Sequence, residues 1–306
     1  MCIACSFLNN KIAPRWVHSP APQNEGVLVL QESLENLVPF IDWSYFLYAW
    51  HFPCSLKILD EDSSRGEEAR RLLQDGKNFL QQIVERKMCE ARSVVGLFPV
   101  TRQGDDVLVQ QSVCDDPVTF HFLRQQHNLM LPCRSLVDFL SPKCTDYMGF
   151  FALSAGFGVK EGRDRLKSAG DDYSAILLET LSGRLTEAYS TKLHLDVIQK
   201  YWGYGEHLTA ANAFGIRPAI GYPSIPDHTE KQTLWRLLKV KENIGIELTD
   251  SFMMMPLNSA CGYYFAHPKS SYFSVGKIGM DQLKDYAERK GWSLETARTW
   301  LNNWVQ

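Results

Sequence analysis

Apolar and polar residues follow two different spacings along this 306-residue chain. One spacing repeats apolar residues every three or four positions, which places them on one face of a helix. It predicts helices over residues 64–91, 171–201, 279–290 and 294–304. The other spacing gives short alternating or continuously apolar runs, which are typical of strands. It predicts a short strand or turn over residues 26–33 and strands near residues 93–100, 106–110, 118–124, 135–140 and 149–159. Three more strands are predicted between about 245 and 276, in the sequences IELTDSFMMM, CGYYFA and YFSVGKI.

Helical and extended stretches are mixed without the regular strand–helix–strand alternation of a parallel sheet. Residues 93–100 and 106–110 flank Gln103, Gly104 and Asp105, a combination that predicts a hairpin. The chain contains no G-x-G-x-x-G sequence, the usual signal of a dinucleotide-binding Rossmann fold. We therefore expect an α+β fold with an antiparallel sheet.

Residues 38–53, VPFIDWSYFLYAWHFP, form the most aromatic stretch of the chain. Four aromatic residues recur there at helical spacing: Phe40, Trp43, Phe46 and Trp50. This spacing predicts a helix face packed in the core. Asp42 stands among them, and a buried carboxylate needs a partner because burying an unpaired charge is costly. Asp42 is therefore expected either to cap a helix or make a structural hydrogen bond, or to bind a ligand.

Composition limits the classes of function. Hydrophobic residues make up 45% of the chain and charged residues 22%, as in ordinary globular proteins. The net charge of −3 argues against a protein that binds nucleic acid through phosphate contacts. No run approaches 18 apolar residues, and the start, MCIACSFL, lacks the basic region of a signal peptide. We expect a cytoplasmic protein without a membrane-spanning helix.

The eight cysteines are scattered over the chain, which is typical of reduced structural thiols. Cys2 and Cys5 form an isolated C-x-x-C. A zinc site would need a second pair of ligands, and no second pair is present at a diagnostic spacing. We expect no metal site.

Residues 215–231, GIRPAIGYPSIPDHTEK, contain three prolines within nine positions. Prolines fix φ, so the loop from Arg217 to Pro226 should be stiff and extended. Asp227 is expected to cap the following helix, with Glu230 as its capping-box partner. A rigid loop that presents an arginine beside a helix start suits a ligand carboxylate. The alternative is a proline-rich connector with a surface arginine.

This loop closely resembles the signature of the C-terminal activation domain of cobalamin-dependent methionine synthase. Further matching motifs occur in the same order: FIDWSYF at 40–46, GDDYSAILLETLSGRLTEAYS at 170–190, LTDSFMMMP at 248–256, and the stretch from GYYFAHPK to YAERKG at 262–291. The resemblance covers the chain from about residue 25 to its end. It implies a curved α+β domain, with helices around a twisted antiparallel sheet, that binds S-adenosylmethionine (AdoMet) without a Rossmann fold.

The resemblance also implies which residues contact AdoMet. The family's contacts fall on Asp42 of the D-W motif, Arg217 and Ala219 of R-P-A, Tyr222 of G-Y-P, and Tyr272 and Phe273 before V-G-K. Arginine can hold the carboxylate of AdoMet and an aspartate its ammonium, while aromatic faces suit the sulfonium or adenine. Without the resemblance, Tyr272 and Phe273 would be interpreted as two core aromatics of a strand.

The implied function is the repair of methionine synthase. When its cobalamin is oxidised to cob(II)alamin, the activation domain supports reductive methylation to methylcobalamin. AdoMet gives the methyl group, and a flavodoxin-type donor gives the electron. The chain has no D-x-H-x-x-G cobalamin motif, so we expect cobalamin on another domain or chain, bound in cis or in trans. On its own, this methyltransferase component is not expected to make methionine.

Two alternatives stay open: a module that binds or senses AdoMet without reactivating cobalamin, and an AdoMet-dependent methyltransferase for a small molecule. We expect residues 1–25 to be an N-terminal arm or linker remnant, and residues 26–306 to form the domain. Because a corrin ring must lie against bound AdoMet, its site should be an open groove. The 215–231 loop should form one wall, with the Asp227 helix start and His228 near the rim.

Overall fold

The structure of the chain is a computed structural model. It describes residues 19–61, 63–110, 117–126, 132–205 and 214–306. Cys2 and Cys5 lie outside these residues. The first described segment packs against the chain near Trp202, whose indole Nε1 donates to the carbonyl of Pro20 at 2.8 Å.

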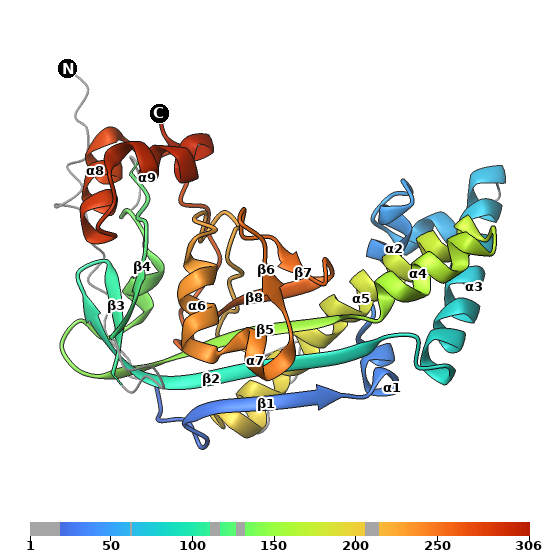
Figure 1. The fold of residues 1–306 in the computed structure, drawn as a ribbon, viewed down its shortest axis with the longest axis horizontal. Helices are drawn as coiled ribbons and strands as arrows, with labels where there is room; N and C mark the ends of the chain where they lie inside the picture. Colours follow the sequence, from blue (N-terminus) through green and yellow to red (C-terminus); the bar gives the residue numbers. More distant parts are fainter. Residues whose placement is uncertain (1–18, 62, 111–116, 127–131, 206–213) are drawn as a thin grey trace.

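An antiparallel six-stranded sheet forms the centre of the fold (Figure 1). Its strands are β1 (Gly26–Glu32), β2 (Glu90–Gln103), β3 (Asp106–Val109), β4 (Val118–His121), β5 (Asp146–Phe157) and β8 (Ser259–Tyr264). The order is β4-β3-β2-β5-β8, and β1 also pairs with β2. Strand β5 thus pairs along one edge of the long strand β2, whereas β1 and β3 pair with different parts of its other edge. Sequence patterns predicted all six of these strands, including the β2–β3 hairpin.

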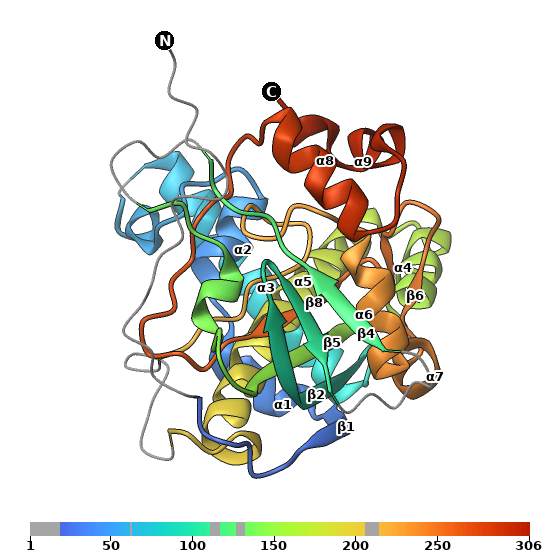
Figure 2. The same cartoon turned by 90° about the vertical axis from the view of Figure 1, so that its left-hand side faces the viewer.

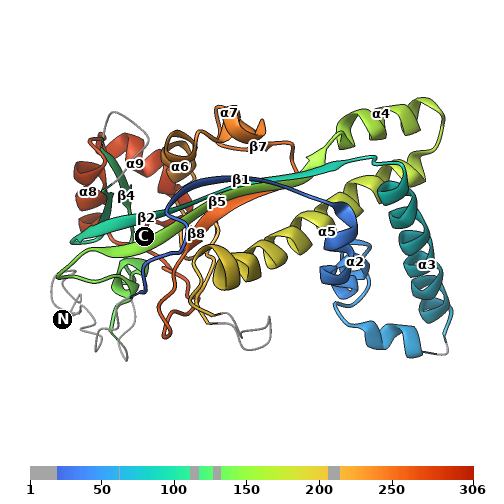
Figure 3. The same ribbon diagram turned by 90° about the horizontal axis from the view of Figure 1, so that it is seen from below.

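Helices cover both faces of the sheet. They are α1 (Leu34–Leu37), α2 (Trp43–Ala49), α3 (Ser64–Glu85), α4 (Val159–Ser168), α5 (Asp172–Asp196), α6 (Glu230–Leu238), α7 (Val240–Ile244), α8 (Met280–Arg289) and α9 (Leu294–Leu301). Short 3-10 turns span Val38–Phe40, Leu56–Asp60, Leu136–Phe139 and Asn302–Trp304, and a π turn over Val197–Tyr201 extends α5. Figure 3 shows α5 running under the sheet towards α2 and α3.

Strand β5 explains why both faces are covered. Its side chains alternate between two cores: Phe151 and Leu153 pack with α3 and α5, whereas Phe150 and Ala152 pack with α6 and α7. Because a strand turns successive side chains to opposite faces, burial on both sides produces the continuous apolar run at 149–153. The observed α+β, antiparallel architecture confirms the expected fold class.

A third, smaller core lies within the C-terminal part. Leu283 and Tyr286 of α8 pack with Ala297 and Leu301 of α9 and with Ile278 before them. Both helices lie at the end of the molecule that carries β3 and β4 (Figure 1, Figure 2). This helix pair is attached to the rest of the chain by apolar contacts with Leu123 and Val275 and by polar contacts, and the polar contacts matter for the site described below.

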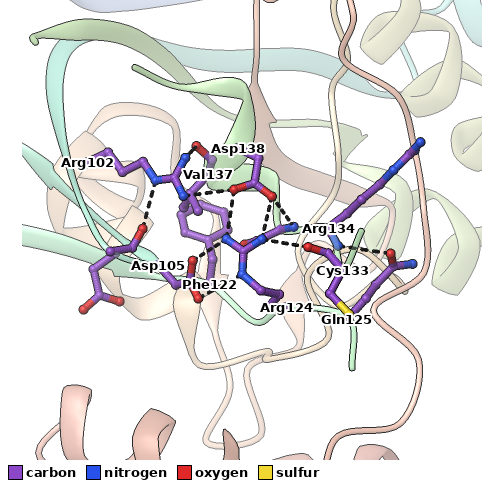
Figure 4. A network of polar contacts seen from close by, with 12 residues as sticks. Arg102, Asp105, Phe122, Arg124, Gln125, Cys133, Arg134, Val137 and Asp138 are labelled. Atoms are coloured by element: carbon purple, nitrogen blue, oxygen red, sulfur yellow. Dashed lines mark hydrogen bonds and ion pairs between the residues drawn. The ribbon is translucent and has the colours of Figure 1, made fainter. Parts of the chain in front are cut away.

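A buried ion network holds the segments around Arg124 (Figure 4). Arg124, 1% exposed, binds Asp105 at 2.5 Å and Asp138 at 2.6 Å. Arg102 binds Asp138 from the other side at 2.9 Å. Two arginines thus balance two carboxylates, which makes burial of the four charges tolerable.

The structure corrects three sequence-based predictions. Residues 135–140 are not a strand: they form a 3-10 turn in which the Asp138 carboxylate accepts from the amide of Ser135 at 3.0 Å while binding both arginines. The stretch YFSVGKI at 272–278 forms no strand: the amide of Val275 donates to the carbonyl of Pro223 at 2.9 Å, but Pro223 has no amide with which to continue a ladder. The segment 246–255 holds only two short strands, β6 (Glu247–Leu248) and β7 (Met254–Met255).

The long helix α5 differs from its prediction at one position. The spacing of its apolar residues predicts that Ile176, Leu178, Leu181 and Leu185 share a buried face. The three leucines are buried, but Ile176 is 47% exposed. Among the residues that the structure describes, no helix is both long and apolar enough to cross a membrane.

Candidate functional site

A cavity of 570 Å³ opens beside the edge strand β8. The proline-rich loop 217–224 forms one wall, and residues 272–274 form another. Residues 259–261 of β8 and the side of α5 that bears Glu187 and Ser190 complete the lining. Its volume is in the usual range for a small-molecule site.

The loop reaches this position by pairing with β8. The amide of Tyr263 donates to the carbonyl of Pro218 at 3.0 Å, and the amide of Ile220 donates to the carbonyl of Cys261 at 3.1 Å. Gly262 makes the approach possible, because a Cβ there would lie 2.2 Å from the oxygen of Pro218. The loop therefore acts as a short additional strand at the sheet edge.

A tight turn then directs the loop outwards. Gly221 adopts φ +95, and its amide donates to the carbonyl of Ile225 at 2.7 Å. This left-handed conformation favours glycine. The turn leaves Tyr222 62% exposed at the edge of the cavity.

Arg217 is fixed from the side of α5. Its Nη1 donates to Ser190 Oγ at 2.7 Å, and its Nη2 donates to Thr191 Oγ1 at 3.0 Å. Its backbone amide donates to the hydroxyl of Tyr272 at 3.0 Å. The guanidinium is thus held at the boundary between the main cavity and a neighbouring one.

The second wall is fastened to the loop. The amide of Val275 donates to the carbonyl of Pro223 at 2.9 Å, and Ser224 Oγ donates to the carbonyl of Phe273. Tyr272 remains 59% exposed, so its ring stands at the mouth of the cavity. Tyr272 and Phe273 therefore line the groove outside any strand, and Phe273 also packs against two of the hydrophobic cores.

Asp42 lies in the neighbouring cavity of 420 Å³, which shares Glu187 and Arg217 with the main one. Its carboxylate caps α2 by accepting from the amide of Ser44 at 2.9 Å. The capping interpretation of Asp42 is therefore correct, yet the side chain also faces a hollow beside Arg217. Of the expected site residues, Arg217, Ala219, Tyr222, Tyr272 and Phe273 line the main cavity, and Asp42 lines its extension.

Beneath Arg217 lies a dry aromatic pair. His194 stacks on Tyr264 with ring centroids 5.3 Å apart, and within the described part of the chain neither His194 Nε2 nor the Tyr264 hydroxyl has a hydrogen-bond partner. Burial, assisted by the positive charge of Arg217, lowers the pKa of His194 from 6.5 to about 3. Arg217 shares the cavity extension with a second cation, Arg184, and with the carboxylates of Asp42 and Glu187.

The expected role of Asp227 is wrong. Helix α6 begins after Thr229, and Asp227 is only 2% exposed. Its carboxylate accepts from the amide and the hydroxyl of Thr229, both at 2.8 Å, and from Tyr286 at 2.6 Å, and it pairs with Lys290 at 3.0 Å. Asp227 therefore binds the residue before α6 without being its N-cap, and Glu230 pairs with Lys290 in place of a capping box. His228 is exposed beside Gly221 but is not part of the cavity lining.

Sequence reasoning missed Glu187, Ser190 and Thr191. From its helical position Glu187 could face either the cleft or solvent, and the sequence favours solvent; the two hydroxyl residues carry no sequence signal of a role. All three lie on one face of α5 at helical spacing, and that polar face within an otherwise buried helix was the available signal. Among the described residues, no group of three or more His, Cys, Asp or Glu side chains could hold a metal ion.

Comparisons with known proteins agree with this geometry. The family model described as "Vitamin B12 dependent methionine synthase, activation domain" matches residues 33–291. A crystal structure of the MetH reactivation domain bound to AdoHcy superposes with a TM-score of 0.91 at 37% sequence identity, over 97% of this chain and 96% of that one. The resemblance of the sequence motifs is thereby confirmed. This chain belongs to the family of activation domains of vitamin B12-dependent methionine synthase.

Proposed function

We propose that this chain binds AdoMet in the groove formed by the two adjoining cavities, and that it supports reductive methylation of cob(II)alamin. The observation that carries the proposal is the fixed position of Arg217 between these cavities, within an open site rimmed by aromatic residues. The related reactivation domain binds AdoHcy, which is AdoMet without the transferred methyl group. A site that fits AdoHcy therefore also fits AdoMet, which differs only by the methyl group on sulfur and by the positive charge of the sulfonium.

The groove offers a partner for each polar part of AdoMet. Arg217 suits the carboxylate, since a guanidinium binds carboxylates through two parallel hydrogen bonds. Asp42, in the cavity extension, suits the ammonium. The exposed rings of Tyr222 and Tyr272 suit the sulfonium and adenine, because a cation gains about 0.5–2 kcal/mol over an aromatic face. The backbone of Ala219 lines the cavity next to β8, and the side chain of Phe273 gives the cavity an apolar wall.

In this reaction the main role of the groove residues is to position AdoMet. One electron from a donor and the methyl group of AdoMet convert cob(II)alamin to methylcobalamin, and neutral AdoHcy leaves. The sulfonium is a good leaving group without a general base, and cobalamin supplies the cobalt chemistry. The chain holds AdoMet so that its methyl faces outwards, which removes the entropic cost of an unguided encounter.

As an activation domain of methionine synthase, the chain acts in reactivation together with the cobalamin domain of that enzyme. We infer that the methyl transfer itself takes place at this groove and that the electron comes from a flavodoxin-type donor. We also infer that residues 26–306 form the domain and that residues 1–25 precede it as an arm or linker remnant.

The openness of the groove favours this role over AdoMet sensing. Tyr222 and Tyr272 are 62% and 59% exposed, so no lid covers the site among the described residues. A sensor would gain from enclosing its ligand, whereas a corrin ring needs an accessible face. A small-molecule methyltransferase would also need to exclude water, and this site is open.

Calorimetry with AdoMet and AdoHcy tests the binding step, in buffer containing a metal chelator. We expect saturable binding of both ligands at one site per chain. Circular dichroism on the same sample serves as the folding control. A folded sample that shows no saturable binding at millimolar ligand would overturn the proposed site.

A further inference from the structure

We propose that Lys290, outside the groove, is a positioning residue that sets the width of the groove and hence its affinity for AdoMet. The inference rests on the proposed function of the groove. It assigns the C-terminal helix pair α8–α9 a role in ligand binding that involves no contact with ligand.

Lys290 directly follows α8 and bonds to the segment at which the ligand loop ends. Its Nζ lies 3.0 Å from Asp227 Oδ2, 2.7 Å from Thr229 Oγ1 and 2.6 Å from Glu230 Oε1. Asp227 follows Pro226, the last proline of the stiff loop. All three bonds therefore hold one end of the loop that carries Arg217 and Tyr222.

This contact is buried and charged. The side chains of Lys290, Asp227 and Glu230 are 8%, 2% and 0% exposed. Burial would raise the pKa of Asp227, but Lys290 and the hydrogen bond from Tyr286 hold it below its usual value. Burial raises the pKa of Glu230, and the Lys290 ammonium opposes that shift. Without it, Asp227 and Glu230 would lose the cation that compensates their burial, which destabilises the position of this segment. The lysine therefore fixes the position of the loop end.

The same helix pair also holds the opposite wall. Residues 272–274 continue into Ile278, whose amide donates to the carbonyl of Trp304 at 2.8 Å and whose carbonyl accepts from the amide of Gln306 at 3.0 Å. Lys277 Nζ adds a bond to the carbonyl of Asn303 at 2.8 Å. Both walls of the groove are thus attached to one unit, so a shift of that unit relative to the loop changes the spacing between them.

A neighbouring residue attaches the same helix to a different place. Arg289 binds Asp106 of β3 and donates to the carbonyl of Phe122 at 3.1 Å, without contacting the ligand loop. The side chain of Gln282 and the backbone of Arg124 exchange two hydrogen bonds, of 2.7 and 2.8 Å. Helix α8 therefore stays on the sheet when Lys290 is lost, and Arg289 provides a matched control.

The test compares Lys290→Met with Arg289→Met, since each removes one cation at the C-terminal end of α8. Calorimetry with AdoHcy gives the affinity, urea unfolding gives the stability, and hydrogen exchange follows the amides of Ile225 and Val275. We expect Lys290→Met to weaken AdoHcy binding roughly tenfold or more and to speed exchange at both amides. We expect Arg289→Met to lower stability while changing affinity by less than about threefold.

Equal losses of AdoHcy affinity in the two variants would show that Lys290 has a merely structural role, and this would overturn the proposal. An unchanged AdoHcy affinity in Lys290→Met would also overturn it. If Lys290→Met does not fold, the triple variant Asp227→Asn, Glu230→Gln, Lys290→Met removes all three charges, and the same affinity loss is expected. If the unaltered chain fails to bind AdoHcy, the proposed function fails. The exchange rates then still decide whether Lys290 holds the groove walls.

Discussion

The hydroxyl of Tyr272 accepts a hydrogen bond from the backbone amide of Arg217 at 3.0 Å, across 55 positions of sequence. This bond joins the two walls of the groove at its mouth. It also fixes the ring of Tyr272, which is otherwise largely exposed to solvent. The residue that we assign to an aromatic face of AdoMet is therefore tied to the residue that we assign to the carboxylate.

Replacing Tyr272 by Phe tests this tie, because the variant keeps the ring and loses only the acceptor. A neutral hydrogen bond contributes about 0.5–1.5 kcal/mol, so AdoMet binding should weaken roughly two- to tenfold. Tyr272→Ala should weaken it further, since the ring is lost as well. Calorimetry would contradict the assignment if both variants bound AdoMet as tightly as the unaltered chain.

Arg217→Ala should weaken AdoMet far more than it weakens the fold. A hydrogen bond to a charged group contributes about 1.5–3 kcal/mol, or roughly ten- to a hundredfold in affinity. Arg217→Lys should recover only part of the loss, because an ammonium cannot bond to Ser190, Thr191 and a carboxylate in one plane. An unchanged dissociation constant in Arg217→Ala, with the fold intact, would remove Arg217 from the site.

Asp42 has two roles that two variants can separate. Asn caps helices about as well as Asp, so Asp42→Asn should leave stability nearly unchanged while weakening AdoMet through loss of the negative charge. Asp42→Ala should lose the same affinity and, in addition, about 1 kcal/mol of unfolding free energy with the cap. Urea unfolding and calorimetry on both variants measure the two effects. If Asp42→Asn bound AdoMet normally, Asp42 would be a cap only.

Acid should destabilise the fold through His194. Its pKa falls from 6.5 to about 3 on folding, so the folded state holds the neutral ring. The stabilisation is complete above pH 6.5 and is lost as pH falls towards 3; at pH 5 the loss is about 2 kcal/mol.

His194→Phe keeps a ring on Tyr264 without a titrating group. Its unfolding free energy should therefore fall less between pH 7.5 and pH 5, by about the same 2 kcal/mol. Urea unfolding at both pH values measures the difference. An identical pH dependence in the two proteins would mean that His194 does not carry this effect.

The sequence predicted the sheet, and it singled out the proline-rich loop that lines the main cavity, because both depend on local patterns. Alternation between two buried faces gives β5 its continuous apolar run, which can be identified without a structure. The three prolines of the ligand loop likewise restrict its backbone through local sterics. The family motifs then indicated which residues of this loop, and which aromatics elsewhere, belong together.

Contacts between distant segments could not be predicted. Asp227 and Glu230 have the spacing of a capping box, and only the arrival of Lys290, 63 residues after Asp227 in the chain, assigns them to a buried ion cluster. Asp138 likewise draws its segment into a 3-10 turn because it binds two arginines from other parts of the chain. Ser190 and Thr191 look like solvated helix residues until Arg217 lies on them.

The central claim is that this chain enables AdoMet to methylate cobalamin held by another domain. The most direct measurement mixes the chain with a methionine synthase cobalamin domain in the cob(II)alamin state, AdoMet and a one-electron donor, and follows methylcobalamin by absorbance. The account predicts methylcobalamin formation that requires the chain, AdoMet and the donor together and that falls sharply with Arg217→Ala. Saturable AdoMet binding without any methylcobalamin would contradict the account and leave AdoMet sensing as the function.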